Sequence, residues 1–306
     1  MKKVLPLVAI IAGIFATSVQ AAPEINLGVL GGENSTAQIG NNQCVKTFLE
    51  DETGATVNIR NASDYSAVIQ GLLGDQVDLV LNMSPKSFAS VYLKDSSKVE
   101  LVGITTDDTD NSKGYHSVIL VKADSPYQKL EDLKGKVFSF ADPDSTSGFL
   151  IPNNQFEQKL GGNMDNQFNG FFKKVGFSGG HEQDILGVLN GQFDGAVTWT
   201  SMVGNREDGY SAGALRKVKN NGFDDLMSNV RIIWESPLIP NGPTIVRGNM
   251  DQTLKQNLIA AVKKLDKENH SCFVKAAGGK LHLEDTSIAE YQSVIDLVKA
   301  QKKTVR

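Results

Sequence analysis

The sequence predicts an α/β fold built from more than one domain. Short β-rich runs alternate with amphipathic helical patterns along most of the chain, and this spacing is typical of mainly parallel sheets. The length of 306 residues corresponds to roughly two domains of ~100–200 residues each. No flexible linker divides the sequence into halves, which indicates a chain that crosses between the two domains more than once.

Individual helices are predicted by their end signals. The helical pattern of 36–54 stops at Gly54, that of 63–76 has Ser63 or Asp64 as its N-cap, and that of 84–95 starts at a Ser-Pro pair. Amphipathic patterns predict three more helices, at 151–160, 180–192 and 251–269. Apolar, β-rich runs predict the strands: 25–30, 56–60, 77–81, 99–104, 116–121, 136–141, 171–177, 193–199 and 229–234.

The first 21 residues have the pattern of a secretory signal peptide. Lys2 and Lys3 precede an apolar core that is too short to span a bilayer, and Val19 and Ala21 are small residues at the cleavage positions. No cysteine follows the predicted cut, which argues against a lipid anchor. We therefore expect an exported, periplasmic protein, with an uncleaved membrane anchor as the alternative.

Charge and cysteine content exclude several classes of function. The net charge of −4, without basic runs, argues against nucleic acid and anionic membranes as partners. The four histidines lack any metal-ligand spacing, so neither a metal nor a cofactor is predicted. In an exported protein the two cysteines, Cys44 and Cys272, indicate a disulfide, with two buried free thiols as the alternative.

Residues 142–150, "DPDSTSGFL", stand between a predicted strand and a predicted helix. The first turn of a helix has four unpartnered N–H groups and about half a positive charge, so it accepts either a hydroxyl cap or a bound oxyanion. These residues alone leave both interpretations open. In parallel sheets, ligands bind where the carboxyl ends of strands meet the following loops, and this loop is one of them. The Gly-rich run "VLGGEN" matches no nucleotide-binding pattern.

Several segments, taken in order, resemble the phosphonate-, phosphite- and phosphate-binding proteins of bacterial ABC importers. The most specific are "DPDSTSGFLIP", "GGHE" and "WESPLIPNGP", supported by "SDYSAVIQGL" and "KGYHSVILV". The resemblance runs from the first strand to about Arg247. It implies a type II-like periplasmic binding protein fold, with two α/β lobes around a ligand cleft. Lobe 1 would comprise residues 22–117 plus 245–306, and lobe 2 residues 118–244.

The resemblance also implies a set of ligand-binding residues. Hydroxyl groups and a neutral imidazole can donate hydrogen bonds to the oxygens of the phosphorus group. For each of them the alternative is a purely structural role, as a helix cap or a packed side chain. The implied residues are Tyr65, Tyr115, Ser145, Thr146, Ser147 and His181. Under the implied fold the C-terminal segment returns to lobe 1, which makes a Cys44–Cys272 disulfide plausible.

The sequence departs from the aminoalkylphosphonate-binding members at two positions. Ser201 and Gly242 stand where those members carry the acids that hold the ligand's ammonium group. A buried ammonium without a carboxylate is costly, so we expect weaker binding of 2-aminoethylphosphonate than in those members. Tight binding would mean that another acid, Glu33 or Glu182, had taken the role. Trp199 either covers an alkyl or methylated-ammonium tail or packs within the protein.

The resemblance implies a monomeric solute-binding protein that captures a phosphorus oxyanion and delivers it to a membrane permease. One alternative is a sensor that presents its ligand to a membrane receptor. Another is a hydrolase that uses Ser145, His181 and Asp184, but the sequence has no GxSxG or SxxK motif and no metal pair. We therefore expect no enzymatic activity.

Overall fold

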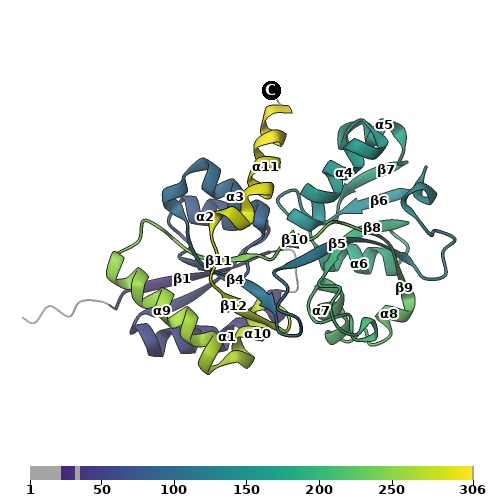
Figure 1. Cartoon of the computed structure of the whole chain (residues 1–306). Coiled ribbons are helices and arrows are strands. Elements are labelled where there is room, and N and C mark those ends of the chain that lie inside the picture. Colours follow the sequence, from purple (N-terminus) through teal and green to yellow (C-terminus); the bar gives the residue numbers. More distant parts are fainter. Residues whose placement is uncertain (1–21, 32–34, 305–306) are drawn as a thin grey trace, which may run out of the picture.

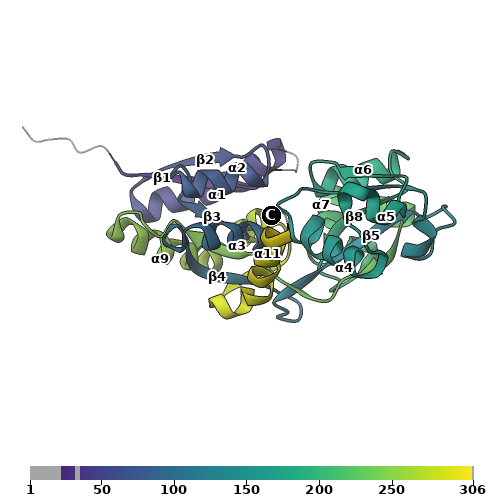
Figure 2. The same cartoon turned by 90° about the horizontal axis from the view of Figure 1, so that it is seen from above.

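The computed structural model describes residues 22–31 and 35–304, arranged as two α/β lobes side by side (Figure 1). The predicted signal peptide and Glu33 lie outside the described residues. Each lobe is built on a six-stranded sheet with helices on both of its faces. Seen from above, the two lobes are separate bodies that meet along one junction, where the C-terminal helix α11 lies (Figure 2).

The sheet of lobe 1 has the strand order β12-β4-β11-β3-β1-β2. Strand β1 pairs in parallel with β2 and β3, whereas β11 is antiparallel to β3 and β4, and β12 is antiparallel to β4. The strands are β1 (Glu24–Val29), β2 (Thr56–Asn61), β3 (Leu79–Val80), β4 (Glu100–Asp107), β11 (Pro243–Val246) and β12 (Leu281–Glu284).

The sheet of lobe 2 has the order β10-β5-β8-β6-β7, with β9 also paired to β5. Strand β6 is parallel to β7 and β8, and β5 is antiparallel to β8, β9 and β10. The strands are β5 (Gly114–Lys122), β6 (Val137–Phe140), β7 (Lys174–Phe177), β8 (Gly195–Thr200), β9 (Val230–Glu235) and β10 (Ile239–Pro240).

Both sheets are therefore mixed, and the prediction of mainly parallel sheets was wrong. Each lobe keeps a parallel core of β-α-β units, as the alternation indicated. The antiparallel pairs come from strands at or after the crossings between the lobes, because a chain that enters a sheet from the neighbouring lobe is free to run in the opposite direction. β10, β11 and β12 have weak sequence signals and were not predicted.

Helices cover both faces of each sheet and complete four apolar clusters. In lobe 1, α1, α9 and α10 pack on one face and α2, α3 and α11 on the other. The helices of lobe 1 are α1 (Ser35–Thr53), α2 (Tyr65–Leu73), α3 (Pro85–Lys94), α9 (Gln252–Glu268), α10 (His270–Ala277) and α11 (Gln292–Thr304). Those of lobe 2 are α4 (Ile151–Leu160), α5 (Gln167–Gly170), α6 (His181–Leu189), α7 (Ala214–Asn220) and α8 (Leu226–Asn229).

The chain passes from the first sheet to the second between β4 and β5, and returns between β10 and β11. The expected lobe boundaries, 117/118 and 244/245, each fall inside a strand: β5 belongs wholly to the second sheet and β11 to the first. Two crossings without a long linker hold the lobes next to each other, so that strand ends of both lobes face the junction.

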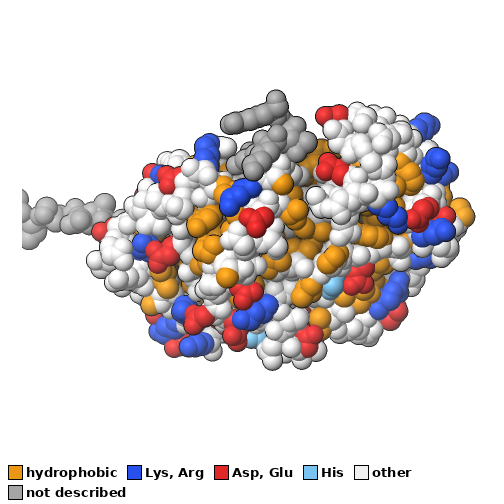
Figure 3. Space-filling model, turned by 45° about the horizontal axis from the view of Figure 1, so that its top comes forward, with side chains coloured by type: hydrophobic (Ala, Val, Ile, Leu, Met, Phe, Trp, Pro, Cys, Tyr) orange, Lys and Arg blue, Asp and Glu red, His pale blue; other side chains and the backbone are white. Residues whose placement is uncertain are grey.

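The distribution of surface charge and the length and polarity of the helices bear on the predicted partners of the protein. Acidic and basic side chains are interspersed on the face shown in Figure 3, without a large block of one sign. Within the described ranges, the helices are too short or too polar to cross a bilayer.

Candidate ligand-binding site

A cavity with a volume of about 90 Å³ lies between the lobes, at the carboxyl ends of the parallel strands. Four helical segments begin at its wall. Tyr65 is the first residue of α2, and Ser84 occupies the N-cap position of α3. Ser145 caps the π-helical segment Thr146–Leu150 that leads into α4, and His181 is the first residue of α6. Each helix start contributes N–H groups and a partial positive charge. Their convergence favours an anion in this cavity.

The three hydroxyl groups of the "STS" triplet have different surroundings. Ser145 accepts a hydrogen bond from the N–H of Gly148 at 2.9 Å, which confirms the cap. Ser145 and Ser147 both line the cavity. Thr146 is not among the described lining residues, because its Oγ1 lies 2.9 Å from Ser84 Oγ and accepts from the backbone N–H of Lys86 at 2.8 Å. Those two partners belong to lobe 1, so Thr146 connects the lobes.

Two tyrosines and a tryptophan form the aromatic part of the wall. Tyr65 and Tyr115 line the cavity, and both side chains are buried. Burial raises the pKa of Tyr115 to about 12, while interactions with Ser147 and Thr146 lower it less. Its phenol therefore remains protonated and can donate a hydrogen bond. Trp199 also lines the cavity and packs edge-on against Tyr115, with ring centroids 5.4 Å apart, so its cavity-lining and packing roles coexist.

His181 is buried at the start of α6, with its Nε2 3.2 Å from Ser145 Oγ. Burial, and to a lesser degree the positive charge of Lys217, lower the pKa of His181 to about 3. The imidazole is therefore neutral near pH 7 and has one N–H to donate. Its Nδ1 is buried without a hydrogen-bond partner among the described residues.

Asp184 lies one turn further along α6 and is fully buried. Within the described part of the chain, neither carboxyl oxygen has a hydrogen-bond partner. Burial raises its pKa from 3.8 to about 8, and weaker interactions with the hydroxyls of Ser139 and Ser178 offset part of the rise. The carboxyl is therefore protonated at pH 7 and adds no negative charge behind the anion site.

The protonation of Asp184 predicts a pH-dependent stability. Between pH 4 and 8 the folded protein keeps a proton that the unfolded chain releases, so this group's contribution falls as pH rises. The buried neutral His181 has the opposite effect, because its contribution to stability rises with pH, but only below pH 6.5. From pH 6.5 to 8 we expect the free energy of unfolding of the wild-type protein to fall by up to about 2 kcal/mol relative to that of Asp184→Asn. Urea unfolding at both pH values measures this difference.

The exposed Asp224 provides a matched control for this experiment. Asp224→Asn should follow the wild-type dependence of the free energy of unfolding on pH. If the free energy of unfolding depends on pH in the same way in wild type and Asp184→Asn, the carboxyl of Asp184 is already ionised in the folded protein.

Of the two positions that depart from the aminoalkylphosphonate pattern, Ser201 lies away from the described lining of the cavity and Gly242 lines it. Ser201 is buried, lies 2.7 Å from Ser211 Oγ, and is absent from the described lining of the cavity. Gly242 lines the cavity, but a Cβ added there would lie 2.4 Å from the carbonyl oxygen of Met83. A larger side chain at position 242 would therefore displace the backbone before α3. Glu182 faces a second, adjoining cavity.

Lys217, Ser84 and Asn42 also line the cavity and were not predicted as site residues. Lys217 projects from α7, with its Nζ 5.7 Å from the ring centroid of Trp199. The Ser-Pro pair before α3 was interpreted only as a helix start. Its place after a predicted strand was the available signal, because the loop at residues 142–150 was considered as a ligand loop on the same ground.

Further contacts join the lobes beside the cavity. Ser84 and Ser87 donate to the carbonyl oxygen of Asp144, at 3.3 and 3.1 Å. On another side of the junction, Ser211 donates to the carboxylate of Asp107, and the N–H of Lys280 donates to the carbonyl of Ser211 at 3.2 Å. The structure thus has its lobes in contact around the cavity.

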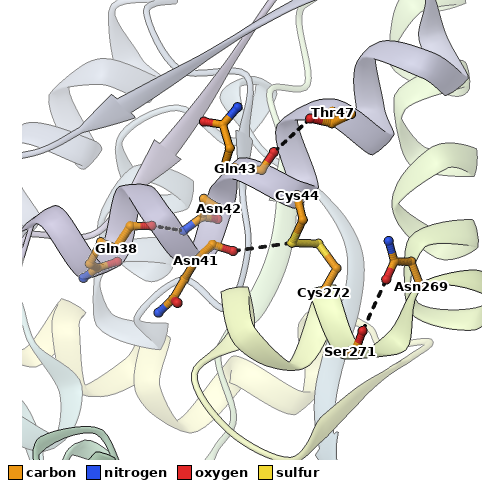
Figure 4. Close-up of a disulfide and its surroundings, with 9 residues drawn as sticks. All are labelled: Gln38, Asn41, Asn42, Gln43, Cys44, Thr47, Asn269, Ser271 and Cys272. Carbon is orange, nitrogen blue, oxygen red and sulfur yellow. Dashed lines mark hydrogen bonds between the residues drawn. A yellow bond between two sulfur atoms is a disulfide. The ribbon is translucent and has the colours of Figure 1, made fainter. Parts of the chain in front are cut away.

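A disulfide joins Cys44 in α1 to Cys272 in α10, with the two Cα atoms 6.0 Å apart (Figure 4). The prediction of this bond is confirmed. Both helices pack on the same face of the lobe 1 sheet, so the bond lies within one lobe. No group of three or more potential metal-ligating side chains occurs among the residues that the structure describes.

The two-lobed architecture with an interlobe cavity is that of the periplasmic binding proteins. Among solved structures, a binding protein component of an ABC phosphonate transporter from Pseudomonas aeruginosa aligns with a TM-score of 0.75 and 24% identity, covering 92% of this chain and 88% of that one. A Prochlorococcus marinus protein, in complex with methylphosphonate, aligns with a TM-score of 0.72 and 19% identity over 92% and 98% of the two chains. At these identities the likeness concerns the fold.

Sequence comparison identifies the family. The model of the periplasmic substrate-binding proteins of ABC phosphonate transporters matches residues 27–296, so the chain belongs to that family. A phosphonates-binding periplasmic protein of Escherichia coli is 33% identical over 69% of this chain and 56% of its own length. A phosphate-import protein of Mycolicibacterium smegmatis is 30% identical over 61% and 59%. The matched segments thus span little more than half of these relatives.

Proposed function

We propose that the protein binds a phosphorus oxyanion of the phosphonate or phosphite class in the interlobe cavity and delivers it unchanged to an ABC permease. The observation that carries the proposal is the convergence of four helix starts, with hydroxyl groups, on one cavity. Family membership supports it. In this proposal the mature protein acts in the periplasm as a monomer, after removal of residues 1–21, and its two lobes divide at the crossings between β4 and β5 and between β10 and β11.

The proposed ligand contacts are hydrogen bonds from neutral groups and helix N–H groups. Hydroxyls of Tyr65, Tyr115, Ser145 and Ser147 and the imidazole of His181 would surround the phosphorus group. Thr146 would act indirectly, by holding lobe 2 against Ser84 and Lys86. Bonds to a charged acceptor contribute ~1.5–3 kcal/mol each, and several of them, less the cost of ordering and desolvation, reach micromolar affinity at roughly −8 kcal/mol.

The geometry argues against the hydrolase alternative. Ser145 and His181 are 3.2 Å apart, which resembles a nucleophile and its base. A catalytic triad also requires a carboxylate that orients the imidazole through Nδ1. Here Nδ1 and both oxygens of Asp184 lack hydrogen-bond partners among the described residues, and the raised pKa keeps Asp184 neutral. A sensor protein would use the same cavity and would differ from the proposed transport protein only in its membrane partner.

Calorimetry with methylphosphonate, phosphite, phosphate and sulfate tests the proposal. We expect binding of a phosphorus oxyanion and a loss of about 1–3 kcal/mol in Ser147→Ala, which removes one donor to a charged acceptor. Ser228→Ala, at an exposed site in α8, is the matched control and should bind as wild type. Absence of heat with every phosphorus oxyanion would refute the proposal, and conversion of the ligand, followed by phosphorus NMR, would favour the hydrolase.

A further inference from the structure

A second cavity adjoins the proposed phosphonate site and extends toward solvent between the lobes. Its volume is about 470 Å³, compared with about 90 Å³ for the first cavity. The two cavities share four lining residues, Gln38, Asn42, Lys217 and Ala276. A substituent on a phosphorus group held in the first cavity therefore has room to continue past these residues into the second.

The ionisable side chains around the second cavity are mainly basic. Arg216 and Lys217 come from α7, and Lys275 and Lys280 from the end of α10 and the segment after it. Glu182 is the one acidic residue among the described lining residues. Among the described lining residues, four basic side chains thus stand against one acidic side chain, in a chain whose net charge is −4.

Lys217 stands where the two cavities meet, and its surroundings fix it there. Its aliphatic stem lies so close to Gly278 that a Cβ at that residue would come within 2.5 Å of Lys217 Cε. Its ammonium nitrogen lies 5.7 Å from the ring centroid of Trp199. Lys217 is half-buried, so its charge is screened less than those of the exposed Lys275 and Lys280.

We propose that the organic group of the ligand carries a negative charge, which makes carboxyalkylphosphonates the ligand class. This inference rests on the proposed function, because it places the phosphorus group in the first cavity. The carboxylate would lie beside Lys217 and face the basic wall of the second cavity. An ammonium group would meet four basic side chains there and one acidic side chain, Glu182.

A matched series of ligands tests the charge preference on the wild-type protein. Ethylphosphonate, 2-aminoethylphosphonate and 3-phosphonopropionate share a two-carbon tail and differ in its terminal group. By calorimetry we expect 3-phosphonopropionate to bind at least tenfold more tightly than 2-aminoethylphosphonate, with ethylphosphonate between them. Raising the ionic strength should narrow this ratio, because the tail meets partly exposed charges.

Substitution of Lys217 tests whether this side chain interacts with the carboxylate of the ligand. Lys217→Gln should reduce the carboxylate-to-amine affinity ratio at least threefold. Lys219→Gln removes the same charge from α7 at a residue that lines neither cavity, and should leave the ratio unchanged. The ratio is independent of any general weakening of phosphonate binding in the variant.

The outcomes separate the two proposals. If ethylphosphonate binds but 2-aminoethylphosphonate binds as tightly as 3-phosphonopropionate or more tightly, the anionic-tail inference is overturned and the proposed function stands. If none of the three phosphonates binds, and methylphosphonate and phosphite also fail, the proposed function is overturned and this inference with it. A ratio that is unchanged in Lys217→Gln would overturn the role of Lys217.

Discussion

Replacing Gly148 by alanine should reduce phosphonate affinity at least a hundredfold. A Cβ at this position would lie 2.6 Å from Ala141 Cβ, 2.7 Å from Ser145 Oγ and 2.9 Å from His181 Cε1. The helix start would have to move away from His181, because all three neighbours are buried. Loss of two charge-assisted hydrogen bonds corresponds to about 3–6 kcal/mol. Calorimetry with methylphosphonate measures the change.

Gly176, in β7 of the same lobe, is the matched control, since a Cβ there would meet no atom within 4 Å. Gly176→Ala should bind as wild type. Thermal unfolding of both variants shows whether Gly148→Ala still folds. A folded Gly148→Ala protein with wild-type affinity would mean that the ligand does not contact this helix start.

The sequence predicted local structure best where signals within a few residues decide it. Helix α4 begins and ends as predicted, at Ile151 and Leu160, and Asp64 caps α2 through the N–H of Ala67. Both features depend on nearby chemistry. Strand direction depends on where the chain returns after a crossing, so the antiparallel strands β11 and β12 could not be predicted from alternation.

The candidate site shows the same limit. Hydroxyls next to a helix start were recognisable as possible anion donors, and Ser145 and Ser147 do line the cavity. Thr146 was indistinguishable from them in sequence, but its Oγ1 faces Ser84 across the lobe junction. Lys217 lies on a helix surface with no motif around it, and only the approach of lobe 1 brings it to the cavity. Residues whose role depends on packing between lobes are thus invisible to local patterns.

Removing the disulfide should have the largest effect on stability. Cys44 and Cys272 are 228 positions apart, and a loop that long corresponds to roughly 5 kcal/mol in the chain-entropy model. Measured gains are often smaller, so we expect the Cys44→Ala/Cys272→Ala variant to lose about 2–5 kcal/mol of its free energy of unfolding. At about 2–4 °C per kcal/mol for a chain of this size, the melting temperature should fall by roughly 5–20 °C.

Ligand affinity should respond far less than stability to the loss of the disulfide. The bond joins α1 to α10 on one face of the lobe 1 sheet and does not cross the junction between the lobes. Well below the melting temperature, methylphosphonate affinity should therefore stay within about threefold of wild type, a change of roughly 0.7 kcal/mol or less. Reduced wild-type protein separates the covalent effect from any cavity left by the substitutions, and should melt close to the double variant. A large loss of affinity at unchanged melting temperature would show that the bond positions the lining residues of these helices, Asn42 and Ala276 among them, rather than stabilising the lobe.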